Sequence, residues 1–297
     1  MKRLLPTQLL LLLLLLLPLD ILAQSGDQGK PLFASDLGSA ASGTKTTYLE
    51  LIKRIIPDLQ IDPNNTDAAI GHKTIPFKHL SENNAPAAAL EGEIKLDSFQ
   101  PYWIKSDGRR ALLLELDLSS EQANQGTNYE GEVNVVAAFT MEPSMKLLDV
   151  MDMKTDRFTG FWEKPSIFAL DSQNDAFLVN SSHSNAGESY NDLTVLFLNH
   201  DRFETITNIF LFDTLGCDAT FTETPSFSVQ PGRTSRYPNV VVTVKVRKNA
   251  DGPECDYPKR GYVKVYRAVY QWNAAKHEYR TTSKELAVLD RFNQKRL

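Results

Sequence analysis

The chain has 297 residues, of which 42% are hydrophobic and 23% are charged, and its formal net charge is −5. A mildly acidic chain carries no overall charge that would attract nucleic acid or anionic lipid, so the sequence predicts neither as a partner. The length is sufficient to bury a sizeable core in one large β domain or two smaller ones.

Residues 1–23 have the pattern of a secretory signal peptide. Lys2 and Arg3 precede an almost all-leucine run at 4–17, and Ala23 provides a small residue at a plausible cleavage point. This run is shorter than the ~20 apolar residues that a membrane-spanning helix needs. We therefore expect cleavage near Ala23, export to the periplasm or the extracellular space, and no membrane span in the mature chain.

Cys217 and Cys255 are the two cysteines of the sequence. In an exported protein two cysteines most simply form one disulfide bond, which we expect here. A pair of free thiols and half of a metal site are the alternatives. A metal pair would need His or carboxylate partners that the sequence does not place.

Residues 24–45 are rich in Gly, Ser, Ala and Asp, which predicts a flexible leader. Residues 46–92 are expected to form a helix and an irregular segment packed on the main domain. Thr47 and Glu50 match a capping box, and Pro57 would end the helix. One face of this helix is apolar, through Tyr48, Leu51, Ile52 and Ile55. That face is expected to pack on the sheet domain, with docking of a partner as the alternative.

From residue 93 the sequence predicts a mainly β domain that extends to residue 297. Asp107-Gly108 lies between apolar runs, which is a strong hairpin signal, and Asn199–Arg202 should form another turn. We expect antiparallel sheets, as a curved sandwich or a propeller-like meander, with a short N-terminal and a C-terminal helix. The expected strands are 100–105, 110–118, 133–141, 147–153, 176–180, 193–198, 203–212, 221–229, 240–247 and 262–272.

Two of the expected strands differ in how clearly the sequence distinguishes a buried face from an exposed one. In 240–247, valines at even positions alternate with a more polar set, which predicts one buried face. In 262–270 both faces are mixed. Val263, Val265 and Val269 predict the core face there, and the tyrosines between them predict the other.

The final strands and helix follow familiar local patterns. The hairpin formed by 269–273 and 278–280 resembles the blade-ending hairpins of secreted β-propellers, a likeness that implies no function. Thr282 and Glu285 match a second capping box. Leu286, Leu289 and Phe292 then form an apolar stripe, which predicts a C-terminal helix.

The densest polar cluster of the sequence is 180–192, which is expected to be a turn-rich loop between strands. We propose ligand-binding roles for Ser182, His183, Asn185, Glu188 and Tyr190. As an alternative, the same segment could be a hydrolase site, with Ser182 as nucleophile, His183 as base and Glu188 or Asp192 as the orienting carboxylate.

No motif specifies a cofactor or a metal. Aspartates at 149–175 lack the spacing of a calcium loop, and the five histidines form no known zinc motif. Trp103, Trp162 and Trp272 are expected in a β core rather than in a ligand-stacking platform.

Together these patterns favour an exported, non-enzymatic binding or interaction protein, whose partner is an unidentified protein or small ligand. A secreted hydrolase with its site around His183 is the first alternative. A structural accessory of an envelope complex is the second.

Overall fold

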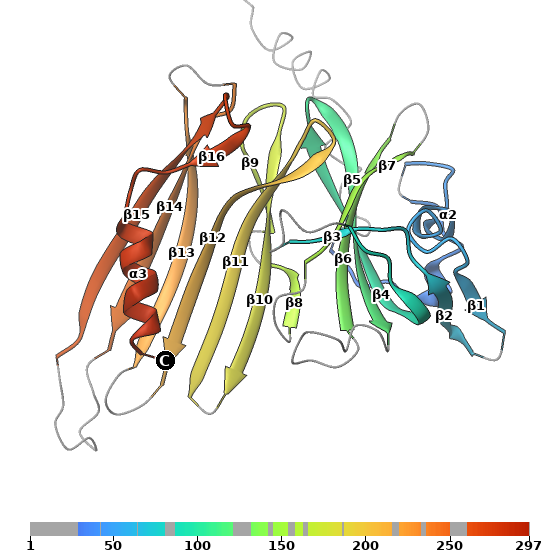
Figure 1. Ribbon diagram of the computed structural model, residues 1–297, viewed down its shortest axis with the longest axis horizontal. Helices are drawn as coiled ribbons and strands as arrows, with labels where there is room; N and C mark the ends of the chain where they lie inside the picture. The colour runs from blue at the N-terminus through green and yellow to red at the C-terminus, as the bar shows by residue number, and fades with distance from the viewer. Residues whose placement is uncertain are drawn as a thin grey trace, which may run out of the picture.

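The computed structural model describes residues 29–41, 43–63, 65–80, 87–120, 132–141, 145–153, 158–162, 166–185, 187–215, 220–232, 236–249 and 260–296. Two mainly antiparallel β-sheets lie side by side, with helix α2 (Tyr48–Ile52) on the far side of one and helix α3 (Glu285–Gln294) across the other (Figure 1). The expected mainly β, antiparallel fold with a helix near each end is confirmed.

The seven-stranded sheet has the strand order β1-β2-β4-β5-β6-β7-β3. Its strands pair antiparallel except β3 and β7, which are parallel. The strands are β1 (Gln60–Asp62), β2 (Asn65–Lys73), β3 (Lys78–His79), β4 (Glu91–Ser106), β5 (Arg109–Ser120), β6 (Glu132–Thr140) and β7 (Leu147–Asp152).

The nine-stranded sheet is an antiparallel meander with the order β16-β15-β14-β13-β12-β11-β10-β8, and β9 also pairs with β10. Its strands are β8 (Phe158–Phe161), β9 (Ile167–Ala169), β10 (Asp175–Asn185), β11 (Glu188–Asn199), β12 (Arg202–Thr214), β13 (Phe221–Gln230), β14 (Asn239–Lys248), β15 (Tyr262–Asn273) and β16 (Glu278–Arg280).

A shared core joins the two sheets. Leu113 of β5 and Phe177 of β10 lie in one buried cluster between them, whereas Leu112 and Leu114 face another cluster under α2, here called the first core. A third cluster lies on the other face of the nine-stranded sheet, under α3. Strand β5 is therefore buried on both faces, which explains its continuous apolar run.

The segment before α2 differs from the expected flexible leader. Leu32 exchanges backbone hydrogen bonds with Phe99 of β4, and Leu37 and Ala41 are fully buried. The few apolar residues of this segment cover the edge of the first core, which composition alone does not reveal. Residues 24–28 lie outside the described part of the chain.

Helix α2 has the predicted capping box and the predicted buried face. The Thr47 N–H donates to Glu50 Oε2 (2.7 Å), and the Glu50 N–H donates to Thr47 Oγ1 (3.2 Å). Tyr48, Leu51 and Ile52 are buried in the first core. The short helix thus packs on the seven-stranded sheet.

Strands β1 and β2 replace the first part of the irregular segment that the sequence predicts after α2. Gly71 of β2 permits this packing, because a Cβ there would lie 2.3 Å from the Ile56 side chain. Residues 65–73 are mostly small or polar, so their strand depends on pairing with β4 rather than on local propensity.

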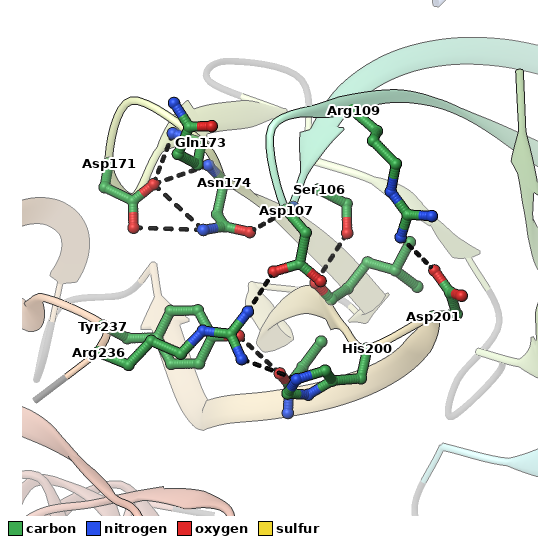
Figure 2. Close-up of polar contacts among 12 residues, drawn as sticks. Ser106, Asp107, Arg109, Asp171, Gln173, Asn174, His200, Asp201, Arg236 and Tyr237 are labelled. Atoms are coloured by element: carbon green, nitrogen blue, oxygen red, sulfur yellow. Dashed lines mark hydrogen bonds and ion pairs between the residues drawn. The ribbon is translucent and has the colours of Figure 1, made fainter. Parts of the chain in front are cut away.

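Four chain segments meet where the β4–β5 turn of one sheet lies against the β11–β12 turn of the other (Figure 2). The predicted hairpin turns are confirmed, since Asp107 and His200 have positive φ. Asp107 makes hydrogen bonds on both sides of this junction: its N–H donates to Asn174 Oδ1 (2.9 Å), and its carboxylate accepts from Arg236 (2.5 Å). Arg236 also donates to His200 Nε2 (2.7 Å).

The prediction for the faces of β15 is wrong. Tyr266 is buried, whereas Val263 and Val265 are each 54% exposed. The register with β14 explains the reversal, because Tyr266 pairs with Val244, whose side chain faces the core under α3. The alternation predicted for β14 is correct and determines the faces of its neighbour.

The predicted capping box of the C-terminal helix is also wrong. Helix α3 begins after Lys284, which has no side-chain cap hydrogen bond. Glu285 instead accepts the backbone N–H of Arg267 on β15 (2.6 Å). The apolar stripe is correct, since Leu289 is buried in the core under α3 and Leu286 and Phe292 pack against it.

Candidate functional site

The polar segment 180–192 forms the end of the β10–β11 hairpin rather than a long loop. The two strands pair in register as far as Asn185 and Glu188, and Gly187 in the turn has φ 96°. Serine and asparagine have weak β propensity, which is why the segment reads as a loop. Pairing with β12 on the outer side stabilises it as sheet.

Four of the five candidate binding residues share one face of this hairpin. His183 lies opposite Tyr190, and Asn185 lies opposite Glu188. His183 Nε2 is 3.0 Å from Asn185 Oδ1, and the Tyr190 hydroxyl donates to Glu188 Oε2 (2.6 Å). These contacts fix the side chains in two hydrogen-bonded pairs.

Ser182 lies on the opposite face of the hairpin, because neighbouring residues of a strand point to opposite sides. Its hydroxyl donates to the carbonyl oxygen of Phe158 (3.5 Å), and Ser184 Oγ lies 3.0 Å from Ser189 Oγ. The register therefore separates Ser182 and Ser184 from His183, the base that the hydrolase alternative requires.

Tyr190 connects the hairpin to the aromatic residues of β12. Its ring centroid is 4.9 Å from that of Phe212 and 6.4 Å from that of Phe210. The hydrogen bond to Glu188, followed by burial, raises the pKa of Tyr190 to about 12. Tyr190 therefore remains a neutral hydrogen-bond donor throughout the physiological pH range.

A groove of about 710 Å³ opens beside Tyr190, between helix α3 and strands β11, β12 and β15. Aromatic, aliphatic and uncharged polar side chains line it, together with two aspartates and no cation. The lining residues are Tyr190, Asp192, Asn208, Ile209, Phe210, Tyr270, Thr281, Ser283, Leu286, Ala287, Leu289, Asp290 and Gln294.

Helix α3 forms one wall of the groove and is attached by buried polar contacts. Strands β12 and β13 pair only at Thr214 and Phe221, so the helix occupies the gap that opens between them. Asn293 Nδ2 donates to the Phe210 carbonyl oxygen (3.1 Å) and to Glu223 Oε2 (2.9 Å). Sequence reasoning missed this site because its walls come from segments about 100 residues apart.

The buried ion pair between Glu223 and Arg296 completes this attachment. Arg296 also lies over the Phe221 ring, 4.4 Å from its centroid. Burial raises the pKa of Glu223, an effect that Asn293 and Arg296 oppose. A charged pair in such a position is costly to break, because either partner alone would be a buried charge.

A second cavity, of about 790 Å³, lies where the ends of the two sheets meet. Both signs of charge line it, including Lys78, Asp149, Arg202 and Glu204. Asp149 accepts the backbone N–H of Phe203 (2.8 Å), and burial raises its pKa. The lining carries more carboxylates than cations, since Asp201 and Glu278 also line it.

Glu115 of β5 is a buried carboxyl group at the interface between the sheets, with only 4% of its surface exposed. The Phe161 backbone N–H donates to it, and its Oε2 atom has no hydrogen-bond partner. Burial, followed by the nearby charge of Asp117, raises its pKa to about 8. The group is therefore largely protonated at neutral pH.

Of the remaining predictions, the structure describes the residues of some and not of others. Trp103 is buried in the first core, and Trp162 and Trp272 pack against the core under α3, as expected. Cys217, Cys255 and residues 1–23 lie outside the described residues, so the disulfide and the signal peptide stay predictions.

Within the described ranges, no three His, Cys, Asp or Glu side chains are grouped to hold a metal ion. Across the same part of the chain, no helix is both long and apolar enough to cross a membrane.

Comparison with known proteins gives no match of any kind: no family model matches the chain, and neither a curated protein nor a solved structure is similar to it.

Proposed function

We propose that the protein is an exported, non-enzymatic binding protein that holds a small uncharged or positively charged ligand in the groove beside α3. The composition of the groove carries this proposal. Phe210, Tyr190 and Tyr270 offer ring faces, while Asp192 and Asp290 offer carboxylates with no cation among the lining residues. Ring faces favour apolar or cationic groups, and the carboxylates oppose an anionic ligand.

The hydroxyl groups of the groove support binding rather than nucleophilic catalysis. Ser283 Oγ donates to the Arg267 carbonyl oxygen (3.1 Å), and Thr281 Oγ1 accepts the Ser283 N–H (3.1 Å). Neither has a histidine or lysine beside it among the lining residues to act as a base. The ligand would therefore leave unchanged.

Export is the second part of this proposal and depends on residues 1–23. If the segment is a signal peptide, intact-mass analysis of the exported protein will show it removed near Ala23. A full-length N-terminus on exported protein would contradict this part and leave the groove proposal intact.

The groove is tested by titrating the purified chain with uncharged oligosaccharides, aliphatic polyamines and polycarboxylates, using calorimetry. We expect binding from the first two classes and none from the third. Replacing the exposed Asp290 with Asn should weaken polyamine binding about tenfold, the effect of one charged hydrogen bond, and spare uncharged ligands.

Asp97→Asn is the matched control, because Asp97 is an exposed aspartate on β4 of the other sheet. It should bind every ligand as the wild type does. Preferential polycarboxylate binding would contradict the proposal. So would hydrolysis of a bound ligand that is lost in His183→Ala with the fold intact, a result that would favour the hydrolase alternative.

A further inference from the structure

The outer face of β13, β14 and β15 is an exposed surface with cations and no carboxylate among its described residues. Antiparallel pairing arranges these side chains in three rows that cross the three strands. The rows are Thr222–Arg247–Val263, Thr224–Lys245–Val265 and Ser226–Thr243–Arg267. All of these side chains are exposed except Thr243, which is partly buried.

The three cations of these rows have no anionic partner in the described part of the chain. None of its ion pairs includes Lys245, Arg247 or Arg267. The chain as a whole carries a net charge of −5, so this local excess of positive charge runs against the average. An acidic partner is the occupant that complements it.

The edge of β15 next to these rows has backbone groups available for pairing. The Arg267 N–H donates to Glu285 Oε2 and the Arg267 carbonyl accepts from Ser283 Oγ, so both groups point away from β14. In an antiparallel strand, alternate residues direct their backbone groups to the same edge. Val263 and Val265 therefore present their N–H and C=O groups at this edge.

No described strand covers that stretch of β15. Strand β16 pairs with β15 only from Gln271 to Asn273. The exposed edge carries two half-exposed valines, a pattern that proteins usually avoid unless another chain pairs there. At Arg267 the chain itself supplies an acidic side chain, Glu285, to the same edge.

We propose that an extended, acidic segment of a partner protein binds here as an additional strand beside β15. Its backbone would pair with Val263 and Val265, and alternate acidic side chains would lie on the outer face near Lys245, Arg247 and Arg267. Backbone pairing provides affinity in this mode of recognition, and alternate side chains provide specificity. This surface is separate from the groove, so it adds a second interaction to the proposed function.

A second copy of this chain fits the edge less well. Antiparallel pairing of β15 with its own copy would place the two sets of three cations on one continuous face, and the like charges would repel. Charge therefore favours an acidic partner over self-association.

The test uses a short peptide of alternating glutamate and valine, labelled for fluorescence anisotropy. We expect it to bind the full chain, and a peptide of alternating lysine and valine not to bind. Val265→Pro should weaken binding about tenfold or more by removing an outward N–H, while the β14 pairing survives because that N–H is not part of it. Val265→Thr keeps the N–H and should bind as the wild type does.

Charge is tested separately by Lys245→Glu with Arg247→Glu, which should abolish binding. Lys95→Glu, an exposed charge reversal on β4, is the matched control and should have no effect. Hydrogen exchange provides a measurement that needs no variant: the peptide should protect the Val263 and Val265 amides.

Three results would overturn the proposal. Equal binding to Val265→Pro and Val265→Thr, with no amide protection, would mean that the cations hold the peptide without strand addition. No binding of the glutamate peptide would remove the acidic partner. A concentration-dependent dimer that Val265→Pro disrupts would make a second copy the occupant.

Discussion

The two sheets of this protein differ in how their faces are covered. The seven-stranded sheet is covered on both faces around β5, by α2 on one side and by the other sheet on the opposite side. The nine-stranded sheet is covered on one face by α3, and the outer face of β13–β15 stays open. The difference suggests that the first sheet contributes mainly stability and the second carries the binding surfaces.

The largest expected effect concerns the buried attachment of α3. Glu223→Ala should destabilise the protein by about 3–5 kcal/mol, because it leaves the Arg296 charge buried without its partner. Urea unfolding followed by circular dichroism measures this change. The control is Glu278→Ala, whose partner Arg280 is half exposed, and its cost should be below about 1 kcal/mol. Equal effects would show that α3 is not held by the ion pair.

The contrast between covered and open strands gives the next effect. Leu114→Ala in β5 should cost about 3 kcal/mol, since its side chain is fully buried and a cavity would remain. Val265→Ala in β15 should cost less than about 0.5 kcal/mol, because its side chain is half exposed. The same urea experiment compares the two. A large cost at Val265 would mean that the outer face is covered in solution.

The interface between the sheets should be sensitive to pH through Glu115. Its folded pKa of about 8 lies above its ordinary value. Its contribution to stability is therefore complete below about pH 4.5 and is lost as the pH rises toward 8. Glu115→Gln cannot ionise, so it should be more stable than the wild type at pH 8 by about 2 kcal/mol.

This gain is smaller than the full pKa shift represents, because an amide N–H₂ would replace the Oε2 atom that has no partner. Unfolding curves at pH 5 and pH 8 measure the difference. A wild type and variant with the same pH dependence would show that Glu115 is ionised in the folded protein.

The smallest expected effect on stability lies at the β4–β5 turn, where the two sheets meet. Gly108→Ala should cost about 1 kcal/mol, because Gly108 has φ 73° and a Cβ there would lie 2.2 Å from Gln173 Oε1. Gly38→Ala is the control, since no atom lies within 4 Å of its added Cβ. Thermal unfolding of both variants checks the difference. Identical melting temperatures would mean that the turn adapts freely.

Local patterns predicted those parts of the fold in which one face is buried and the other is wet. The valines of β14 alternate, and their faces are correct. Strand β15 carries large side chains on both faces, so its orientation depends on its register with β14, which no local pattern contains. The body of the β10–β11 hairpin was predicted as strands 176–180 and 193–198, but its polar end was not, because the serines and asparagines there form strands only through long pairing with neighbours.

The candidate site was likewise predicted only in part from the sequence. Tyr190 was singled out from sequence and does line the groove. His183 and Glu188, which contact Tyr190 on the same hairpin, were predicted as binding residues because segment 180–192 is dense in polar residues. The opposite wall of the groove, on α3, had only an apolar stripe as its signal. Nothing in the sequence connects that stripe with Tyr190, since the contact depends on how β12 and β13 separate.

That separation also affects the order in which the molecule can assemble. Strands β12 and β13 pair only at Thr214 and Phe221. At the neighbouring residues of β12, Asn293 of α3 donates to the Phe210 carbonyl oxygen, and Arg296, just after the helix, donates to the Phe212 carbonyl oxygen, 84 residues earlier. Since α3 follows every described strand in the sequence, the boundary between β12 and β13 lacks the contacts of the helix while the strands are being synthesised. A nascent or proteolytically shortened molecule without the helix would expose the edge of β12 to other chains, which makes the helix a safeguard against misassociation.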